Sequence, residues 1–150
     1  MKNILLTVII LFSILSCKKE NNYENDSKLC TLLAEMLKSD QSIRGLDLWT
    51  ISDSLWKTQT EIDKKNTKLL IEITKKRGWV SKDGLGCTEY IAPVILFRHA
   101  PKEFWKEIKP LIDKEYAEKR MGQGDYWFID NHLKGRPMDF GNGEIEIKTD

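Results

Sequence analysis

The sequence predicts an all-α fold. Its 150 residues are enough for one domain. Along several segments, apolar residues recur every three or four positions, the spacing that places side chains on one face of a helix. Glycine or proline follows most of these segments, and both residues commonly end helices. Together these features predict a single domain of about five helices.

The first predicted helix follows Ser27, the expected N-cap, and runs to about Arg44, with Gly45 as its stop. Its inner face would carry Leu29, Leu32, Leu33, Met36 and Leu37. The second helix is expected from Ser52 or Asp53 to Arg77, with Gly78 as the terminator. One stripe of this helix holds four apolar residues and two polar ones, Gln59 and Asn66.

The third candidate element, residues 87–98, is the most apolar part of the domain. Its apolar side chains would cover all sides of a helix, which is typical of a buried helix. A buried strand gives the same short apolar run, and Pro93 fits the interior of neither element. The preceding KDGLG segment resembles a turn.

Two further helices complete the predicted domain. Pro101 can open a fourth helix because its missing N–H costs nothing at that position, and Pro110 is expected to bend it. A fifth helix is expected over about residues 124–133, ended by Gly135 and Pro137. The terminal GNGEIEIKTD is expected to form a short alternating strand or a loose tail.

The first residues differ from the rest of the chain. Lys2 precedes an apolar run over residues 4–15, which is too short for the roughly 20 residues of a spanning helix. A basic start followed by a short apolar region and small residues is typical of a secretory signal peptide. The alternative is a buried N-terminal helix, but no polar face accompanies the run.

The end of this segment, Ile14-Leu15-Ser16-Cys17, resembles the lipobox of bacterial lipoproteins. That resemblance implies cleavage before Cys17, acylation of its thiol and attachment of the protein to a membrane of the cell envelope. Two or three acyl chains anchor a protein stably where one is marginal. Because Lys18 rather than aspartate follows the cysteine, the rule for enteric bacteria favours the outer membrane.

Four regions follow from these features: a signal peptide over residues 1–16, a lipidated N-terminus and polar tether over 17–26, a helical domain over 27–135, and a tail over 136–150. Loss of the signal peptide removes Lys2 and leaves 23 basic residues (24 minus 1) against 23 acidic ones. A nucleic-acid-binding protein normally has a basic excess. We therefore expect no nucleic-acid partner.

Two cysteines remain after Cys17, namely Cys30 and Cys87. An oxidising compartment would allow them to form one disulfide. The sequence leaves open whether their Cα atoms lie close enough for a bond. Two buried free thiols are the alternative.

Standard catalytic motifs are absent from the sequence, including a nucleophile elbow, a phosphate-binding glycine loop and H-E-x-x-H. His99 and Glu103 are spaced like two ligands on one helix face, but Pro101 lies between them. Asp130 and His132 would diverge on a helix. We predict no metal and no cofactor.

Several polar residues stand out against the helical pattern. Asp40 and Arg44 are four residues apart, as in a surface ion pair. Asn66 lies on an apolar stripe with Asp63 one turn earlier, and a polar group on a buried face needs a partner. His99 ends the most apolar segment, where a cation interacts favourably with the helix dipole.

These residues resemble a bacterial domain-of-unknown-function family in their order. The family pattern runs approximately D-Q-x-x-R, D, G-W-P, G…Q-H-A, D-R and G-x-P-Q-x-Y-G-T, and the similarity covers about residues 30–143. The resemblance implies a helical domain with a recurrent polar set but no particular activity. On this chain that set is Asp40, Gln41, Arg44, Asp63, His99 and Asp130.

The chain departs from the family pattern at several places. Val80 replaces the proline of G-W-P, Arg98 replaces the glutamine of Q-H-A, and Asn131 replaces the arginine of D-R. The last motif reads Met-Asp-Phe-Gly-Asn at residues 138–142. If the family has a catalytic site, this chain has lost or rebuilt part of it.

Three hypotheses follow for the function. The first is a non-catalytic module that binds a protein or small ligand through Asp40, Gln41, Arg44 and Asn66. The second is a purely structural hydrogen-bond network. The third is a hydrolase in which His99, oriented by Asp63 or Asp130, acts as general acid or base. We favour the binding module over the enzyme.

Overall fold

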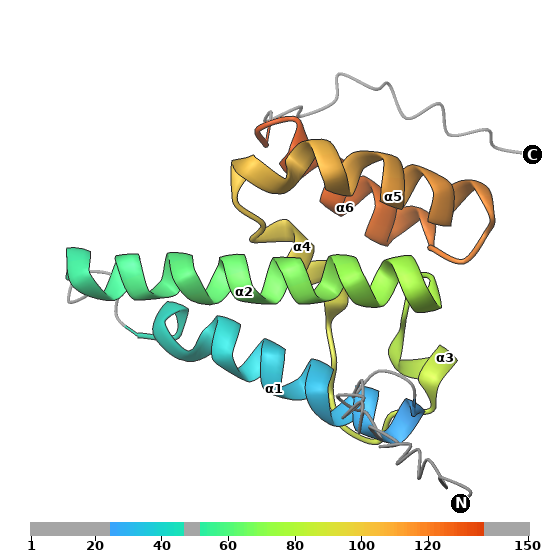
Figure 1. Cartoon of the computed structure of the whole chain (residues 1–150), viewed down its shortest axis with the longest axis horizontal. Coiled ribbons are helices and arrows are strands. Elements are labelled where there is room, and N and C mark those ends of the chain that lie inside the picture. The colour runs from blue at the N-terminus through green and yellow to red at the C-terminus, as the bar shows by residue number, and fades with distance from the viewer. Residues whose placement is uncertain (1–24, 47–51, 137–150) are drawn as a thin grey trace, which may run out of the picture.

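The computed structural model describes residues 25–46 and 52–136, and this part of the chain forms six α-helices (Figure 1). They are α1 (Asp26–Arg44), α2 (Asp53–Arg77), α3 (Lys82–Leu85), α4 (Pro93–Arg98), α5 (Trp105–Ala117) and α6 (Gln123–Leu133), with a 3₁₀ turn, η1 (Lys102–Phe104), before α5. The described residues contain no strand, which confirms the all-α prediction. The tail for which a short strand was considered lies outside the described residues.

The ends of the two long helices follow from their capping residues. α2 begins after its N-cap Ser52, as predicted, and ends at Gly78, whose positive φ of 78° suits glycine. α1 begins earlier than predicted. Its N-cap is Asn25 rather than Ser27, because the Asn25 side chain accepts hydrogen bonds from the backbone N–H groups of Ser27 and Lys28.

The apolar third segment is helical over only half of its predicted length. α4 has Pro93 at its first turn, where proline is tolerated because no N–H is needed there. Residues 87–92 therefore lie outside the helix, and the prediction of a helix from residue 87 is wrong. The KDGLG segment contains the short helix α3, which ends at Gly86 in the left-handed conformation.

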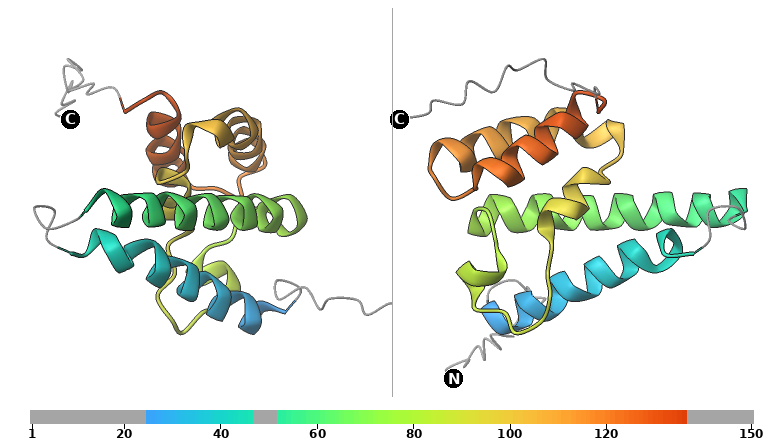
Figure 2. Two further views of the ribbon diagram at one scale, coloured as in Figure 1. Left: turned by 60° about the vertical axis from the view of Figure 1, so that its left-hand side comes forward. Right: turned by 180° about the vertical axis from the view of Figure 1, so that it is seen from behind.

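The helices form layers around α2. In Figures 1 and 2, α1 lies on one side of α2, α5 and α6 lie side by side on the other, and α4 runs between them. α4 contacts α1, α2 and α6. Its side chains Leu96 and Phe97 are almost completely buried, and burial of a large apolar side chain stabilises a fold by about 1.5–3 kcal/mol. The short α4 is therefore the centre of the core.

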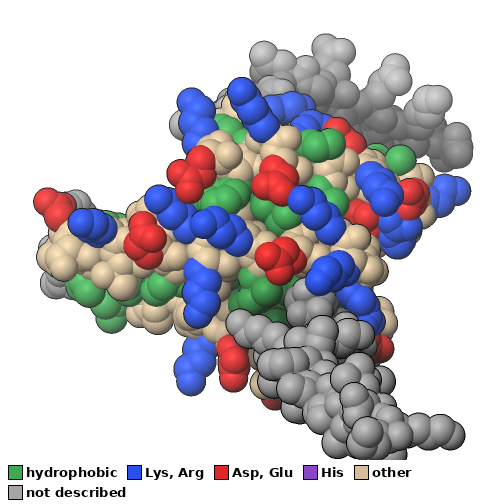
Figure 3. Space-filling model, viewed as in Figure 1, with side chains coloured by type: hydrophobic (Ala, Val, Ile, Leu, Met, Phe, Trp, Pro, Cys, Tyr) green, Lys and Arg blue, Asp and Glu red, His purple; other side chains and the backbone are tan. Residues whose placement is uncertain are grey.

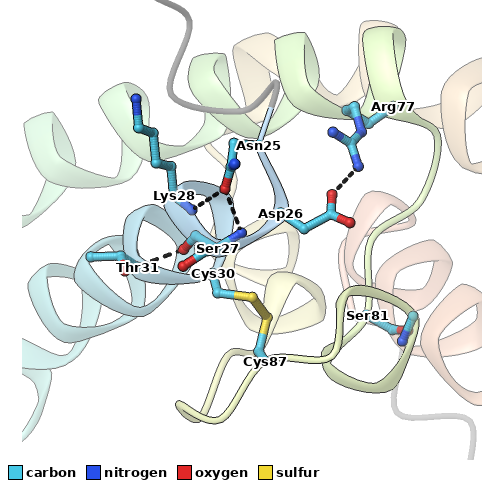
Figure 4. The surroundings of a disulfide bond; sticks show 10 residues. Asn25, Asp26, Ser27, Lys28, Cys30, Thr31, Arg77, Ser81 and Cys87 are labelled. Carbon is cyan, nitrogen blue, oxygen red and sulfur yellow. Dashed lines mark hydrogen bonds and ion pairs between the residues drawn. A yellow bond between two sulfur atoms is a disulfide. The ribbon is translucent and has the colours of Figure 1, made fainter.

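A disulfide joins α1 to the segment after α3 (Figure 4). Cys30 and Cys87 have their Cα atoms 5.5 Å apart and are separated by 57 residues. Beside the bond, the Arg77 guanidinium contacts the Asp26 carboxylate, so a second link ties the start of α1 to the end of α2. The disulfide and the ion pair both stabilise the end of the domain at which α1 begins.

The described surface mixes both signs of charge. On the face in Figure 3, acidic and basic side chains interleave, with apolar side chains exposed between them. Among residues 25–46 and 52–136, no helix has the length and hydrophobicity needed to cross a bilayer.

A buried carboxylate holds the loop after α2 against α5. Glu115, which is 1% exposed, accepts hydrogen bonds from the Trp79 backbone N–H at 2.7 Å and from the Arg120 guanidinium at 2.6 and 2.8 Å. The Arg120 hydrogen bond is the main reason that the pKa of Glu115 is lowered, and it outweighs the opposing effect of burial. The ionised carboxylate is therefore part of the folded structure.

We expect Glu115→Gln to lower the free energy of unfolding at pH 7 by about 2 kcal/mol, since charge-assisted hydrogen bonds are lost. The folded-state pKa of Glu115 is below its unfolded value of about 4.3, so the carboxylate stabilises the protein above that pH and this contribution disappears as the pH falls through the folded pKa. Urea unfolding at pH 7 and pH 3 should show the difference from wild type shrinking in acid. Glu118→Gln, at an exposed partner of Arg120, is the control, and an equal difference at both pH values would contradict the prediction.

Candidate functional site

The most distinctive polar contact in the domain joins α1 to the end of α4. Asp40 is 1% exposed, and His99 is the residue that caps α4. The Nδ1 atom of His99 lies 2.9 Å from both carboxylate oxygens of Asp40. Because an ionised carboxylate only accepts hydrogen bonds, Nδ1 must be the donor. This contact fixes the orientation of the ring and leaves Nε2 as the second functional atom.

The opposite side of the His99 ring is available. The His99 side chain is 20% exposed, and no described residue forms a hydrogen bond with its Nε2. With the proton on Nδ1, Nε2 is an acceptor that can receive a hydrogen bond or a proton. A histidine held by a buried carboxylate on one side and accessible on the other is arranged for interaction with a ligand.

Arg44 and Asp63 form the second contact of the cluster. The Arg44 guanidinium donates to the two Asp63 carboxylate oxygens at 3.1 and 2.7 Å, a two-point geometry that orients both groups. Gln59 donates to the same carboxylate at 2.8 Å. Arg44 also reaches the backbone carbonyl of Asp40 at 3.4 Å. α1 and α2 are therefore joined by the same residues that border the Asp40–His99 pair.

We refer to Asp40, Arg44, Gln59, Asp63 and His99 together as the His99 site. Its formal charge is −1 when His99 is neutral, because one arginine faces two aspartates, and it is zero when His99 is protonated. Arg44, like His99, is about one-fifth exposed. Asp40, Asp63 and Gln59 are buried.

One buried acceptor in the His99 site has no partner among the described residues. Gln59 is 1% exposed, and its Oε1 accepts no hydrogen bond from any described residue. An unsatisfied buried polar atom costs about 1–3 kcal/mol. The site therefore combines two acceptors that lack a described donor, Gln59 Oε1 and His99 Nε2.

Gln41 and Asn66 were also predicted to bind a ligand, and both form contacts within the packing of α1 and α2. Gln41 donates to the Asp40 carboxylate at 2.5 Å. Asn66, on the stripe of α2 that the sequence marked as unusual, donates to the Met36 carbonyl at 3.1 Å and to the Ser39 hydroxyl at 3.2 Å. Asn66 thus links α2 to α1 and contacts neither His99 nor Arg44 in a hydrogen bond.

Neither aspartate that was expected to orient His99 does so. Asp63 is bound by Arg44 and Gln59, and Asp130 on α6 pairs with Lys134 at 2.6 Å and with Lys109 at 3.4 Å. The role falls to Asp40. Asp40 and His99 are 59 residues apart in the sequence, so no local pattern indicates their contact. In the expected ion pair of Asp40 with Arg44, the guanidinium nitrogen lies 4.0 Å from the carboxylate oxygen.

Sequence reasoning named two further polar residues, Gln59 and His132, without assigning either to a functional site. Gln59 belongs to the His99 site, and its place on an apolar stripe was the available signal. His132 is a buried residue outside the His99 site. Its Nε2–H donates to the Ala100 carbonyl at 2.9 Å, and its Nδ1 accepts a hydrogen bond from the Arg136 guanidinium at 3.1 Å. Burial lowers the pKa of His132, and the nearby Arg136 adds to this effect. His132 is therefore a neutral structural residue.

No group of three metal-ligating side chains occurs within residues 25–46 and 52–136. The sequence matches no family model, no curated protein and no solved structure. The geometry of the chain itself must therefore support any functional assignment.

Proposed function

We propose that the protein is a lipid-anchored protein of the bacterial cell envelope whose helical domain binds a ligand at the His99 site. The observation that carries the proposal is the contact between buried Asp40 and partly exposed His99, whose Nε2 forms no hydrogen bond with any described residue. His132 differs from His99 because it is buried and has both ring nitrogens in hydrogen bonds.

The envelope location is supported by the N-terminal sequence. The short apolar run and the Ile-Leu-Ser-Cys motif ending at Cys17 predict cleavage and lipidation there. Cys17 lies outside the described residues. The Cys30–Cys87 disulfide is of a kind that persists in oxidising compartments, which agrees with a domain that folds outside the cytoplasm. Lys18 favours the outer membrane.

The chemistry of the His99 site favours a hydrogen-bond donor as its ligand. Nε2 of His99 is an acceptor in the neutral ring, and the site carries a formal charge of −1 when His99 is neutral. Arg44 is already bound to Asp63, which reduces its attraction for an anion. A hydroxyl, amide or ammonium group on a protein or small molecule fits these conditions, and a nucleic-acid phosphate does not.

The Asp40–His99 contact also favours a second candidate, a hydrolase-like enzyme. A carboxylate that fixes Nδ1 keeps Nε2 ready to take a proton from water or a hydroxyl, which is the task of a general base. In this alternative, His99 is the general base and Asp40 orients it, the role that the sequence had suggested for Asp63 or Asp130. Arg44 would hold Asp63 in place.

The experiment that tests the proposal compares three full-length proteins. Cys17→Ala should lose palmitate incorporation and membrane association, because the thioether cannot form. His99→Gln should keep both properties and the wild-type melting temperature. Unchanged membrane association and palmitate incorporation in Cys17→Ala would remove the anchor from the proposal.

Binding is tested with the same proteins as bait in detergent-solubilised envelope extract. We expect the wild type and Trp127→Ser, a change at an exposed side chain of α6, to retain the same partner or to gain thermal stability from the same small-molecule fraction. His99→Gln should lose that response. An identical response from His99→Gln would contradict the proposed site. Hydrolysis of a captured substrate by the wild type and not by His99→Gln would favour the enzyme.

A further inference from the structure

A groove of about 480 Å³ lies along α5 and α6, separate from the His99 site. Its floor is apolar and is formed by Trp105, Pro110 and Leu133, while four lysines and Asp130 form its sides. These two helices form the layer farthest from α1, where the described chain begins (Figures 1 and 2). A volume of this size is typical of small-molecule sites.

The floor of the groove is held in place before any ligand binds. The Trp105 indole Nε1 donates to the Ala100 carbonyl at 2.9 Å. The edge of the same ring contacts His132, with 5.0 Å between ring centroids. A ring that is fixed by its own hydrogen bond offers a flat apolar surface whose side-chain entropy falls little further on binding.

The lysines of the groove differ in how their charges are balanced. Lys134 pairs with Asp130, and Lys109 contacts Asp113, Asp130 and the Tyr126 hydroxyl. These carboxylates balance the charges of both lysines, and the lysines in turn balance the charge of Asp130. This part of the groove is nearly neutral.

Lys102 and Lys106 are different because no described carboxylate pairs with either of them. The acidic residues beside them in the sequence are engaged elsewhere: Glu103 contacts Lys64 of α2, and Glu107 contacts Lys75 of α2. The Nζ atom of Lys102 lies 6.0 Å from the centre of the Trp105 ring. Two lysines without a described carboxylate partner, Lys102 of η1 and Lys106 of α5, therefore border the apolar floor.

We propose that this groove binds a small amphiphilic anion, an apolar chain or ring that carries a carboxylate. The apolar part would cover Trp105 and Leu133, and the carboxylate would lie between Lys102 and Lys106. The unbalanced positive charge favours an anion over a neutral or cationic molecule of the same shape. The limited volume favours a small molecule over a protein segment.

Octanoate is a suitable probe, with octanamide and octylammonium as neutral and cationic molecules of the same chain length. The full chain, labelled with ¹⁵N at its tryptophan indoles, is placed in phosphatidylcholine nanodiscs. Octanoate should shift the Trp105 resonance saturably, identified by its absence in Trp105→Phe, while the Trp56 resonance stays unchanged. Octanamide and octylammonium should bind at least about tenfold more weakly. No saturable shift of Trp105, or equal affinity for the three compounds, would overturn the proposal.

A charge-reversal variant tests the two lysines. Lys102→Glu/Lys106→Glu changes two exposed side chains and should reduce octanoate affinity by about tenfold, with an unchanged helical circular-dichroism spectrum. Lys38→Glu/Lys57→Glu, at exposed positions of α1 and α2, changes the net charge by the same amount; it is the matched control and should change affinity by less than about twofold. Equal losses in both variants would show that net charge rather than the groove attracts the anion. The comparison of the three compounds on the wild type does not depend on how the variants fold.

Discussion

Asp63→Ala is expected to lower the free energy of unfolding by about 2–3 kcal/mol. The change removes the carboxylate that accepts two hydrogen bonds from Arg44 and one from Gln59. Removing one partner of a buried ion pair costs about 3–5 kcal/mol, and the partial exposure of Arg44 reduces this figure because water can solvate the guanidinium. Urea denaturation at pH 7, followed by circular dichroism, measures the loss.

The matched control for Asp63→Ala is Glu61→Ala, two residues earlier on the same helix. Glu61 is exposed and lies 3.6 Å from Lys64, so its removal should change stability by less than about 0.5 kcal/mol. Arg44→Met/Asp63→Leu should recover part of the loss, since no buried charge is then left unpaired. A stability of Asp63→Ala within 0.5 kcal/mol of wild type would show that the contact does not hold α1 against α2.

This measurement also bears on how the His99 site works. If the site were only a structural network, His99→Gln and Asp63→Ala would both destabilise the domain. We expect Asp63→Ala to do so and His99→Gln to leave the stability within about 0.5 kcal/mol, because the glutamine amide can still donate to the buried Asp40 carboxylate, which also accepts from Gln41. That result would agree with the proposal that Asp63 maintains the site and His99 contacts the ligand.

Loss of the disulfide is the second change with a large expected effect. The Cys30–Cys87 bond closes a loop of 57 residues, for which the loop-entropy relation gives about 4 kcal/mol of stabilisation. We expect Cys30→Ala/Cys87→Ala to lower the free energy of unfolding by about 3–4 kcal/mol. The urea midpoint of the double variant should fall, with little change in helical content at low urea.

Reduction of the wild-type protein provides the control for this change. Treatment with a phosphine reductant should shift the urea midpoint of the wild type towards that of Cys30→Ala/Cys87→Ala and should leave the double variant unchanged. Coincident unfolding curves for oxidised and reduced wild type would contradict a stabilising role of the bond.

The helices were largely predictable because they depend on neighbours in the sequence. Ser52, Gly78 and the apolar spacing between them define α2, since caps and periodicity act over a few residues. α4 was predicted too long because a continuous apolar run does not show where a buried helix starts. The buried residues of this segment fit a helix. The helix begins only at Pro93, which occupies its first turn.

The sequence alone supports an all-α domain through local spacing, while a polar set that includes Asp40, Arg44, Asp63 and His99 and an N-terminal lipidation motif at Cys17 follow from the resemblance of short motifs to known patterns. Only the tertiary structure decides the pairings. Asp40 rather than Asp63 or Asp130 holds His99, Asp63 binds Arg44, and Cys30 meets Cys87. The physical reason is that these contacts join residues 19 to 59 positions apart, so they depend on how α1, α2 and α4 pack and not on any pattern within one helix.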